Sequence, residues 1–204
     1  MNSFVNCSNC NVPLSFQAVG TVLKVCGRCG TPNTRKADFS LPAVSAPAED
    51  NTLLKLGTTG KYDKLGFTLI GRVQYLYNEG YTNFWLAHWA DGDLDWLAEW
   101  EGGYAWIERK AVEPGEEMLK TEVEGAIDIE GQSFTAIRES QHWKTGWEGE
   151  LPTFTVEEDN YKMLELGAEG DKTAKIHFYS SAYSEIFYGE FDYFETFGFT
   201  NLRN

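Results

Sequence analysis

All four cysteines of this 204-residue chain lie within its first 29 residues, in two Cys-x-x-Cys pairs. Cys7 and Cys10 form the first pair, and Cys26 and Cys29 form the second. Each pair can place two thiolates on one edge of a tetrahedron, so that the two pairs complete a four-sulfur metal site. A disulfide framework would distribute cysteines through the larger, loop-rich part of the chain. The pattern therefore predicts a zinc ribbon over residues 1–36.

The metal of such a ribbon is expected to be structural, because four cysteine ligands leave no open coordination position. Asn11 and Gly30 follow the two pairs, and both residue types tolerate the positive φ that these loops need. Metal binding, on the order of 10 kcal/mol, would hold together a module too short to have its own core. Residues 12–16 and 21–25 are expected to pair as a hairpin. Zinc is the predicted ion, and a four-sulfur iron site or a redox-active dithiol are the alternatives.

The segment after the cysteine module separates two differently charged parts of the chain. Residues 37–52 are rich in Ala, Pro and Ser, and their two prolines disfavour helix, which predicts an extended linker. The larger domain is expected over residues 53–204. The chain's net charge of −14 comes from the part after residue 48, because four of the 17 basic side chains but only one of the 31 acidic ones lie in residues 1–48.

The hydrophobic pattern of the larger domain has a period of two, which is typical of β-strands. The first strand is predicted to place five apolar residues on one face: Phe67, Leu69, Val73, Tyr75 and Tyr77. The expected strands are Phe67–Tyr77, Phe84–Trp89, Leu94–Trp100, Tyr104–Glu108, Phe134–Trp143, Thr153–Glu157, Tyr161–Leu166, Ala174–Tyr179 and Glu185–Phe191. One or two helical turns are expected near Asp192–Phe197.

We therefore predict a mainly β fold, with an N-terminal zinc ribbon and a larger all-β domain. A weak internal repeat favours two related antiparallel β-barrel or sandwich-like units, at about 53–118 and 119–204. Two glycines six residues apart precede Phe67-Thr68-Leu69-Ile70, and two more with the same spacing precede Phe134-Thr135-Ala136-Ile137. A chance match in a glycine-rich β protein is the alternative.

Composition limits the classes of partner and compartment. A strongly acidic domain repels phosphate backbones, so nucleic acid is not an expected ligand of the main domain, whereas a basic protein surface is. The longest apolar runs are only a few residues long, far short of the roughly 20 that cross a bilayer. The N-terminus lacks the basic flank and apolar run of a secretory signal. These features predict a soluble, cytoplasmic chain without a transmembrane segment.

Residues that carry catalysis in other proteins occur here without the spacing that catalysis needs. His88, His142 and His177 lie in three separate expected strands, and no serine lies in a nucleophile elbow. Residues 91–95 alternate carboxylates like a calcium loop, but the sixth and twelfth positions are not Gly and Glu, which favours a hairpin turn. No catalytic residue is therefore assigned.

The seven tryptophans permit two interpretations. Five lie within residues 85–106, and the others are Trp143 and Trp147. Aromatic rings beside carboxylates can bind sugars or cationic ligands, but they also fill the cores of small β domains. We assign most of them to the core and regard any exposed subset as a candidate binding surface.

Several strings between residues 53 and 204 resemble a bacterial family, domain of unknown function 4178, in that family's order. They are Leu56-Gly57-Thr58-Thr59-Gly60, Phe67-Thr68-Leu69-Ile70-Gly71-Arg72, the tryptophan-rich Phe84–Trp100 hairpin, Glu148-Gly149-Glu150-Leu151-Pro152, Tyr188-Gly189-Glu190 and Thr200-Asn201-Leu202-Arg203. A cysteine ribbon before this domain also resembles the family's arrangement. The resemblance implies no catalytic residues. It implies an accessory role beside membrane-remodelling proteins and polyamine-synthase-like enzymes, in envelope stress or bacterial defence.

The leading hypothesis is a non-enzymatic zinc-ribbon adaptor with an acidic β domain that binds another protein, one with a basic surface or associated with a membrane. One alternative is a small-molecule or glycan-binding module that uses exposed tryptophans and carboxylates. The other is an enzyme with an unrecognised site, which a deep pocket joining a histidine to buried carboxylates would favour.

Overall fold

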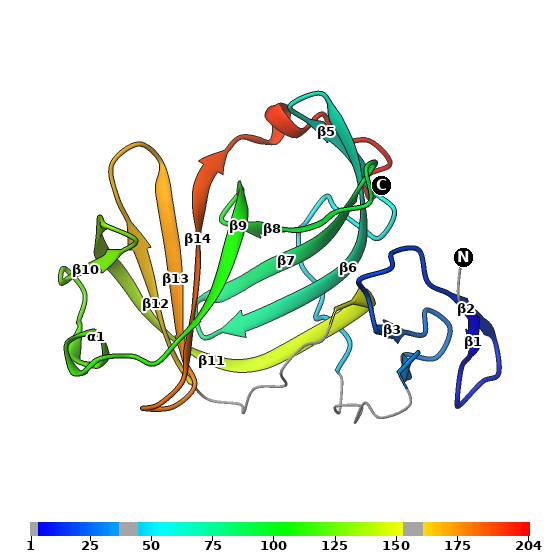
Figure 1. Cartoon of the computed structure of the whole chain (residues 1–204), viewed down its shortest axis with the longest axis horizontal. Coiled ribbons are helices and arrows are strands. Elements are labelled where there is room, and N and C mark those ends of the chain that lie inside the picture. Colours follow the sequence, from blue (N-terminus) through cyan, green and yellow to red (C-terminus); the bar gives the residue numbers. More distant parts are fainter. Residues whose placement is uncertain (1–3, 37–44, 153–160) are drawn as a thin grey trace.

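The computed structural model describes residues 4–36, 45–152 and 161–204. Within these ranges the chain is mainly β-structure, as the sequence predicts, with a large antiparallel sheet and an N-terminal cysteine cluster (Figure 1). The expected strand Thr153–Glu157 and the first part of the expected linker, 37–44, lie outside the described residues.

The centre of the molecule is a closed antiparallel barrel. Each strand of the ring pairs with the next one, and the last pairs with the first. In the described part of the chain the ring contains eight strands, which are, in spatial order, β6 (Leu65–Tyr77), β7 (Gly80–Trp89), β8 (Leu94–Trp100), β9 (Gly103–Val112), β14 (Ser184–Asp192), β13 (Lys172–Phe178), β12 (Lys162–Gly167) and β11 (Gln132–Leu151).

Strand β11 closes the ring because it is long enough to pair with two neighbours. Its first half pairs with β12, and residues 142–149 pair with β6. At the second contact the two backbones approach closely. A Cβ added to Gly71 would lie 1.8 Å from the carbonyl oxygen of Glu150, and one added to Gly149, where φ is 74°, would lie 2.3 Å from a β6 carbonyl oxygen. Glycine at both positions is therefore a requirement of barrel closure.

The two units expected from the sequence are two halves of this one barrel. Residues 53–118 supply β6–β9, preceded by the short strand β5 (Thr59–Tyr62), and residues 119–204 supply β11–β14, preceded by β10 (Ala126–Ile129). The halves join edge to edge where β9 pairs with β14 and where β6 pairs with β11. The sequence left open whether the units share a core, and the structure places residues of both in one cluster.

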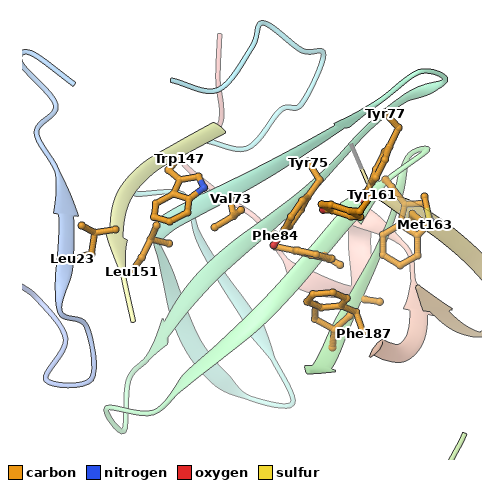
Figure 2. Close-up of a cluster of buried hydrophobic side chains, with 14 of the residues drawn as sticks. Leu23, Val73, Tyr75, Tyr77, Phe84, Trp147, Leu151, Tyr161, Met163 and Phe187 are labelled. Atoms are coloured by element: carbon orange, nitrogen blue, oxygen red, sulfur yellow. The ribbon is translucent and has the colours of Figure 1, made fainter. Parts of the chain in front are cut away.

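That shared cluster fills the barrel with aromatic side chains (Figure 2). Tyr75 and Tyr77 of β6 point into it, as do Phe84 of β7 and Phe187 of β14, whose ring centroids are 4.8 Å apart. Leu23, from the cysteine module, belongs to the same cluster. The barrel and the N-terminal module therefore share apolar packing.

Two further apolar clusters cover the outside of the barrel. On one side, Leu54 and the C-terminal Phe197 pack with Trp85. On the other side, Ile127 of β10 and residues of the short helix α1 (Glu116–Lys120) pack over β12–β14. The last regular element, the 3₁₀ turn η1 (Phe194–Phe197), confirms the helical turn predicted near Asp192–Phe197. The helix α1 was not predicted.

The cysteine module consists of two short hairpins. Strand β1 (Phe4–Asn6) pairs with β2 (Pro13–Ser15), and β3 (Leu23–Val25) pairs with β4 (Pro32–Thr34). The expected hairpin between residues 12–16 and 21–25 is therefore wrong. The reason is that each Cys-x-x-Cys loop reverses the chain within its own hairpin, so that each of these segments pairs across a cysteine loop.

Candidate functional site

The four predicted ligands converge. The Sγ atoms of Cys7, Cys10, Cys26 and Cys29 all lie within 4.8 Å of one another. The Cys7–Cys29 pair is separated by 3.6 Å and the Cys10–Cys26 pair by 3.7 Å. A tetrahedral ion with metal–sulfur bonds near 2.3 Å requires sulfur–sulfur edges of about 3.8 Å. A disulfide would require about 2.05 Å, so the separations fit a metal site and the cysteines are free.

The backbone of each cysteine loop has the conformation that the sequence predicts. Asn11 has φ of 59° and Gly30 has φ of 71°. The Asn11 N–H donates to the carbonyl oxygen of Cys7 at 2.9 Å, and the Gly30 N–H donates to that of Cys26 at 2.8 Å. The two loops are therefore built alike, and in each the fourth residue after the first cysteine completes a tight turn.

Asn33, in β4, connects the two cysteine loops, and the sequence did not single it out. It is 4% exposed. Its carboxamide accepts from the Ser8 backbone N–H at 2.8 Å, and donates to the Cys7 Sγ at 3.6 Å and to the Thr31 carbonyl oxygen at 2.7 Å. Amides that orient ligand sulfurs commonly tune metal affinity. The only signal in the sequence is an asparagine four residues after the last cysteine.

Electrostatics favour the thiolate form at the exposed edge of the site. The Thr31 hydroxyl lies 3.3 Å from the Cys29 Sγ, and hydrogen bonding by Thr31 lowers the pKa of Cys29 to about 6. Cys7 and Cys26 are buried, whereas Cys29 is exposed. An all-sulfur donor set of this kind suits zinc or iron, and its four donors fill a tetrahedral coordination shell.

The cysteine module is attached to the barrel through a buried carboxylate. Strand β3 pairs with the end of β11, where Lys24 is opposite Glu150. Glu150 is fully buried and accepts from the Gln17 backbone N–H at 2.9 Å, the Thr21 hydroxyl at 3.1 Å and the Lys24 ammonium at 2.9 Å. The sequence prediction of a ribbon on a flexible tether does not describe this arrangement, because the ribbon contributes a strand to the barrel sheet.

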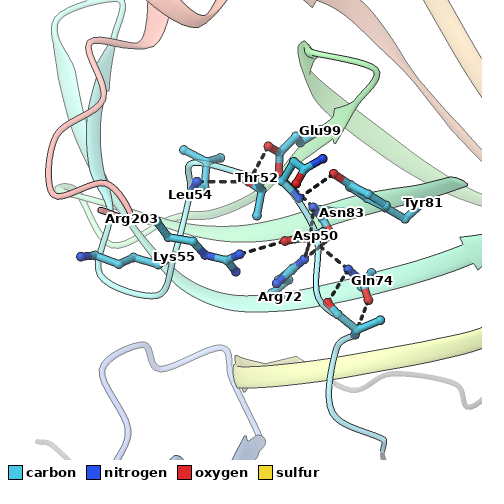
Figure 3. Close-up of polar contacts among 12 residues, drawn as sticks. Asp50, Thr52, Leu54, Lys55, Arg72, Gln74, Tyr81, Asn83, Glu99 and Arg203 are labelled. Atoms are coloured by element: carbon cyan, nitrogen blue, oxygen red, sulfur yellow. Dashed lines mark hydrogen bonds and ion pairs between the residues drawn. The ribbon is translucent and has the colours of Figure 1, made fainter.

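The described end of the expected linker is also fixed. The Asp50 side chain is fully buried and forms ion pairs with Arg72 and Arg203, while Gln74 and Asn83 donate to it at 2.9 and 3.1 Å (Figure 3). Residues 45–52 lie against β6 and β7 and are not a free spacer. The physical reason is that a buried carboxylate needs its cationic partners.

The barrel interior holds a buried polar network as well as aromatic rings. His177 is fully buried, and its ring nitrogens lie 3.2 Å from the hydroxyls of Tyr77 and Tyr161. Tyr179 lies 3.3 Å from the His177 Nδ1 and donates to Glu185 at 3.2 Å. Burial lowers the pKa of His177 well below 6.5. The imidazole is therefore neutral and acts as a hydrogen-bonding core residue.

Two of the three histidines lie close together in the barrel interior, because His142 and His177 both pack against the Tyr161 ring, whereas His88 is on β7. His142 is buried beside Tyr161, with ring centroids 4.2 Å apart, and His88 lies on β7 with partial exposure. Asp91-Gly92 forms the predicted turn between β7 and β8, where the Gly92 N–H donates to the Trp89 carbonyl oxygen. Most tryptophans belong to the core, as predicted. Among the described residues, Trp143 is the tryptophan with an exposed side chain, at 49% relative exposure.

A pocket of about 200 Å³ opens at the barrel end formed by the β6–β7 and β8–β9 turns. Lys175 of β13 and Glu165 of β12 lie in it, both 3% exposed, beside Arg138 of β11 and Trp100 of β8. Of these residues, the sequence analysis noted Trp100 as one of the clustered tryptophans but not the three charged residues. In the sequence, charged and apolar residues alternate along β13, but this alternation does not show which face of the strand lines the barrel interior.

Comparisons with protein-family models, with curated proteins and with solved structures find no match for this chain. Within the described ranges, the chain consists of a ribbon whose four cysteines could hold a metal ion, joined to an eight-stranded antiparallel barrel. Of the helices in those ranges, none has the length and apolar character needed to cross a bilayer.

Proposed function

We propose that this chain is a non-enzymatic adaptor, in which a structural zinc ribbon and an acidic β-barrel together form a surface that binds another protein. The observation that carries this proposal is the closed four-sulfur cluster. A metal held by four thiolates has no coordination position left for a substrate or a reactive water. The buried attachment at Glu150 supports it further, because it makes the ribbon part of a continuous surface.

The proposed metal is zinc. Tetrahedral zinc and iron both accept four thiolates, so the distances alone fit either ion. Zinc has no redox chemistry, and a purely structural role needs none. A zinc-loaded protein is colourless, whereas an iron centre of this type absorbs visible light.

The proposed partner has a basic surface. The chain carries a net charge of −14. One depression of about 290 Å³ at the β5–β6 and β7–β8 turns is lined by Asp63, Asp91 and Asp93 beside the apolar rings and side chains of Trp89 and Leu65. Carboxylates around an apolar floor suit a lysine or arginine side chain, which has an apolar stem and a charged head.

The test is affinity purification of the tagged chain and of two variants with equal charge change. Asp63→Asn/Asp91→Asn/Asp93→Asn removes three carboxylates from the depression. Glu113→Gln/Glu117→Gln/Glu122→Gln removes three exposed carboxylates elsewhere. We expect a stoichiometric protein partner with the unmodified chain and the control variant, and weaker, less salt-dependent binding with the first variant. Recovery of no specific partner, together with substrate turnover by the purified chain, would overturn the proposal.

The biological setting follows from the family resemblance. On the resemblance to domain of unknown function 4178, we propose that the chain is a bacterial, cytoplasmic accessory protein in envelope stress or defence, and that its partner is associated with a membrane. The identity of the recovered partner tests this setting directly.

A second candidate function is small-molecule binding in the barrel. The observation that favours it is the pocket at the β6–β7 end, which brings the Trp100 ring together with Lys175, Arg138 and Glu165. The sequence predicts such binding at exposed tryptophans, whereas Trp100 at this pocket is 3% exposed and forms its wall.

A further inference from the structure

The end pocket contains a buried lysine whose charge is weakly compensated. Lys175 lies in the middle of β13 and is 3% exposed. Its Nζ lies 4.8 Å from the centroid of the Trp100 ring and 5.8 Å from that of Tyr77. Its ion pair with Glu165 spans 3.6 Å, which is longer than a hydrogen bond. A lysine is seldom buried without close partners, so this amine needs a specific explanation.

Glu165 is held mainly by other groups. Its Oε1 accepts from the Trp100 indole N–H at 3.0 Å. Its Oε2 accepts from the Arg138 Nε at 3.0 Å and from the Arg138 Nη2 at 2.7 Å. The carboxylate is therefore oriented toward Arg138 and Trp100, and the Lys175 amine keeps hydrogen-bonding capacity toward the pocket that it lines.

The size and charge of the pocket define the ligand. Its volume is about 200 Å³, and a water molecule occupies roughly 30 Å³ of the liquid, so the pocket admits a molecule with a few non-hydrogen atoms. Inside the pocket two cations, Lys175 and Arg138, are balanced by Glu165 and by Glu101, which pairs with Arg138, and the further carboxylate of Glu79 is exposed to solvent. An added charge would be uncompensated, so a neutral ligand with a polar atom for the amine fits best.

The environment also makes the amine a nucleophile. Burial lowers the pKa of Lys175 to about 8, while Glu165 and Glu101 oppose the shift and Arg138 adds to it. An ordinary lysine has a pKa near 10.4, so the neutral, reactive form of Lys175 is far more abundant near neutral pH.

We propose that this pocket binds small neutral aldehydes or ketones and that Lys175 holds them as a reversible imine. The amine nitrogen attacks the carbonyl carbon, and the carbonyl oxygen, protonated by the protons that the nitrogen loses, leaves as one water molecule. A carbon–nitrogen double bond replaces the carbon–oxygen double bond, and water reverses the step. No oxidant or reductant takes part, and the inference does not depend on the adaptor function.

The test uses propanal as the probe, with cyanoborohydride to reduce and trap imines on the intact chain, followed by peptide mapping of every lysine. We expect Lys175 to be modified at least about tenfold faster than Lys172 at pH 7. Lys172 is the matched control, because it lies on the same strand and its ammonium donates to Gln132 at 3.1 Å. The rate at Lys175 should rise with pH, with its midpoint near pH 8, and level off at higher pH.

Two variants separate pocket binding from simple reactivity. Ser140→Leu adds an apolar side chain to the pocket wall, and it should slow modification of Lys175 at least about fivefold while leaving Lys172 unchanged. Lys175→Arg should abolish the fast phase. Because the unmodified chain gives the decisive result, failure of either variant to fold leaves the test intact. Modification of Lys175 no faster than that of Lys172 in the unmodified chain would overturn the proposal.

Discussion

At the scale of single residues, Asn33 is the side chain outside the four cysteines that links the two cysteine loops. Its carboxamide joins the Ser8 backbone of the first cysteine loop to the Thr31 backbone of the second, and its N–H lies against the Cys7 sulfur. A hydrogen bond to a thiolate stabilises the metal-binding form, and the bridge keeps the two loops at their working separation.

We therefore expect Asn33→Ala to weaken zinc binding by about 10- to 100-fold, which is the usual cost of losing such a supporting group. The measurement is competition with a chromophoric chelator at pH 7. Asn9→Ala is the matched control, because Asn9 is an exposed asparagine of the first cysteine loop. Equal zinc affinity in the unmodified chain and in Asn33→Ala would show that the bridge does not support the metal.

A single residue in the barrel interior is also expected to contribute to the pH dependence of stability. His177 is fully buried, and burial lowers its pKa well below 6.5, with His142, Lys175 and Arg109 nearby as further causes. Below pH 6.5 the unfolded chain binds a proton at this residue that the folded chain excludes, so the free energy of unfolding decreases as the pH falls.

We expect the His177 contribution to reduce the free energy of unfolding by about 1.4 kcal/mol per pH unit below pH 6.5. Urea unfolding between pH 7.5 and 5 measures the slope. In His177→Gln, which keeps a polar side chain at the same position, the slope should be shallower by that amount. An identical slope in both proteins would assign the acid sensitivity to other groups.

At the scale of elements, β-bulges decide which face of a strand is buried inside the barrel. Phe67 and Leu69 were predicted to share a face with Val73, but the register of β6 shifts between Leu69 and Gly71. Phe67 and Leu69 therefore pack in the outer cluster, and Val73 packs in the inner one. An extra residue in a strand reverses the alternation that follows it, and a period-two pattern cannot reveal this.

The segment of residues 45–54 is an element of a different kind, since it has almost no regular structure of its own. Asp50 anchors it through Arg72 and Arg203, and its Thr52 hydroxyl donates to the buried Glu99 (Figure 3). Removing the Asp50 carboxylate would leave the Arg72 guanidinium, which is 2% exposed, with the partly exposed Glu148 as its remaining ion-pair partner.

We expect Asp50→Ala to lower the free energy of unfolding by about 3–5 kcal/mol, the cost of breaking a buried ion pair on one side. Chemical denaturation measures the change. Glu49→Ala, at the exposed neighbouring position, should change stability by less than about 0.5 kcal/mol. Equal, small effects of the two substitutions would mean that residues 45–54 are a dispensable linker.

The sequence predicted the elements more completely than their assembly. The cysteine spacing predicted the four thiols that the structure brings together, and the alternation of apolar residues located strands such as Leu94–Trp100, which matches β8 in both bounds. Tertiary features were not predictable. Lys24 and Glu150 are more than a hundred positions apart in the sequence, and the pocket brings Lys175 together with the distant Trp100. No local sequence pattern encodes such pairings.

At the scale of the whole molecule, the weak repeat in the sequence corresponds to equivalent positions in the two half-barrels. The Leu69 N–H of β6 donates to the carbonyl oxygen of Thr58, just before β5. In the same way, the Ala136 N–H of β11 donates to that of Gly125, just before β10. Leu69 and Ala136 are each followed by a register shift in the pairing with the next strand, at 69–71 and at 136–138. The ribbon adds to only one half, at the end of β11, which makes the molecule asymmetric.

The central claim is that four sulfurs enclose one ion, which gives the ribbon its shape. Elemental analysis of protein purified without added metal, combined with titration of reactive thiols, tests it most directly. We predict one zinc per chain, with all four thiols protected until a strong chelator removes the ion. A chain that is folded without bound metal, or one whose cysteines are oxidised as two disulfides, would contradict the claim.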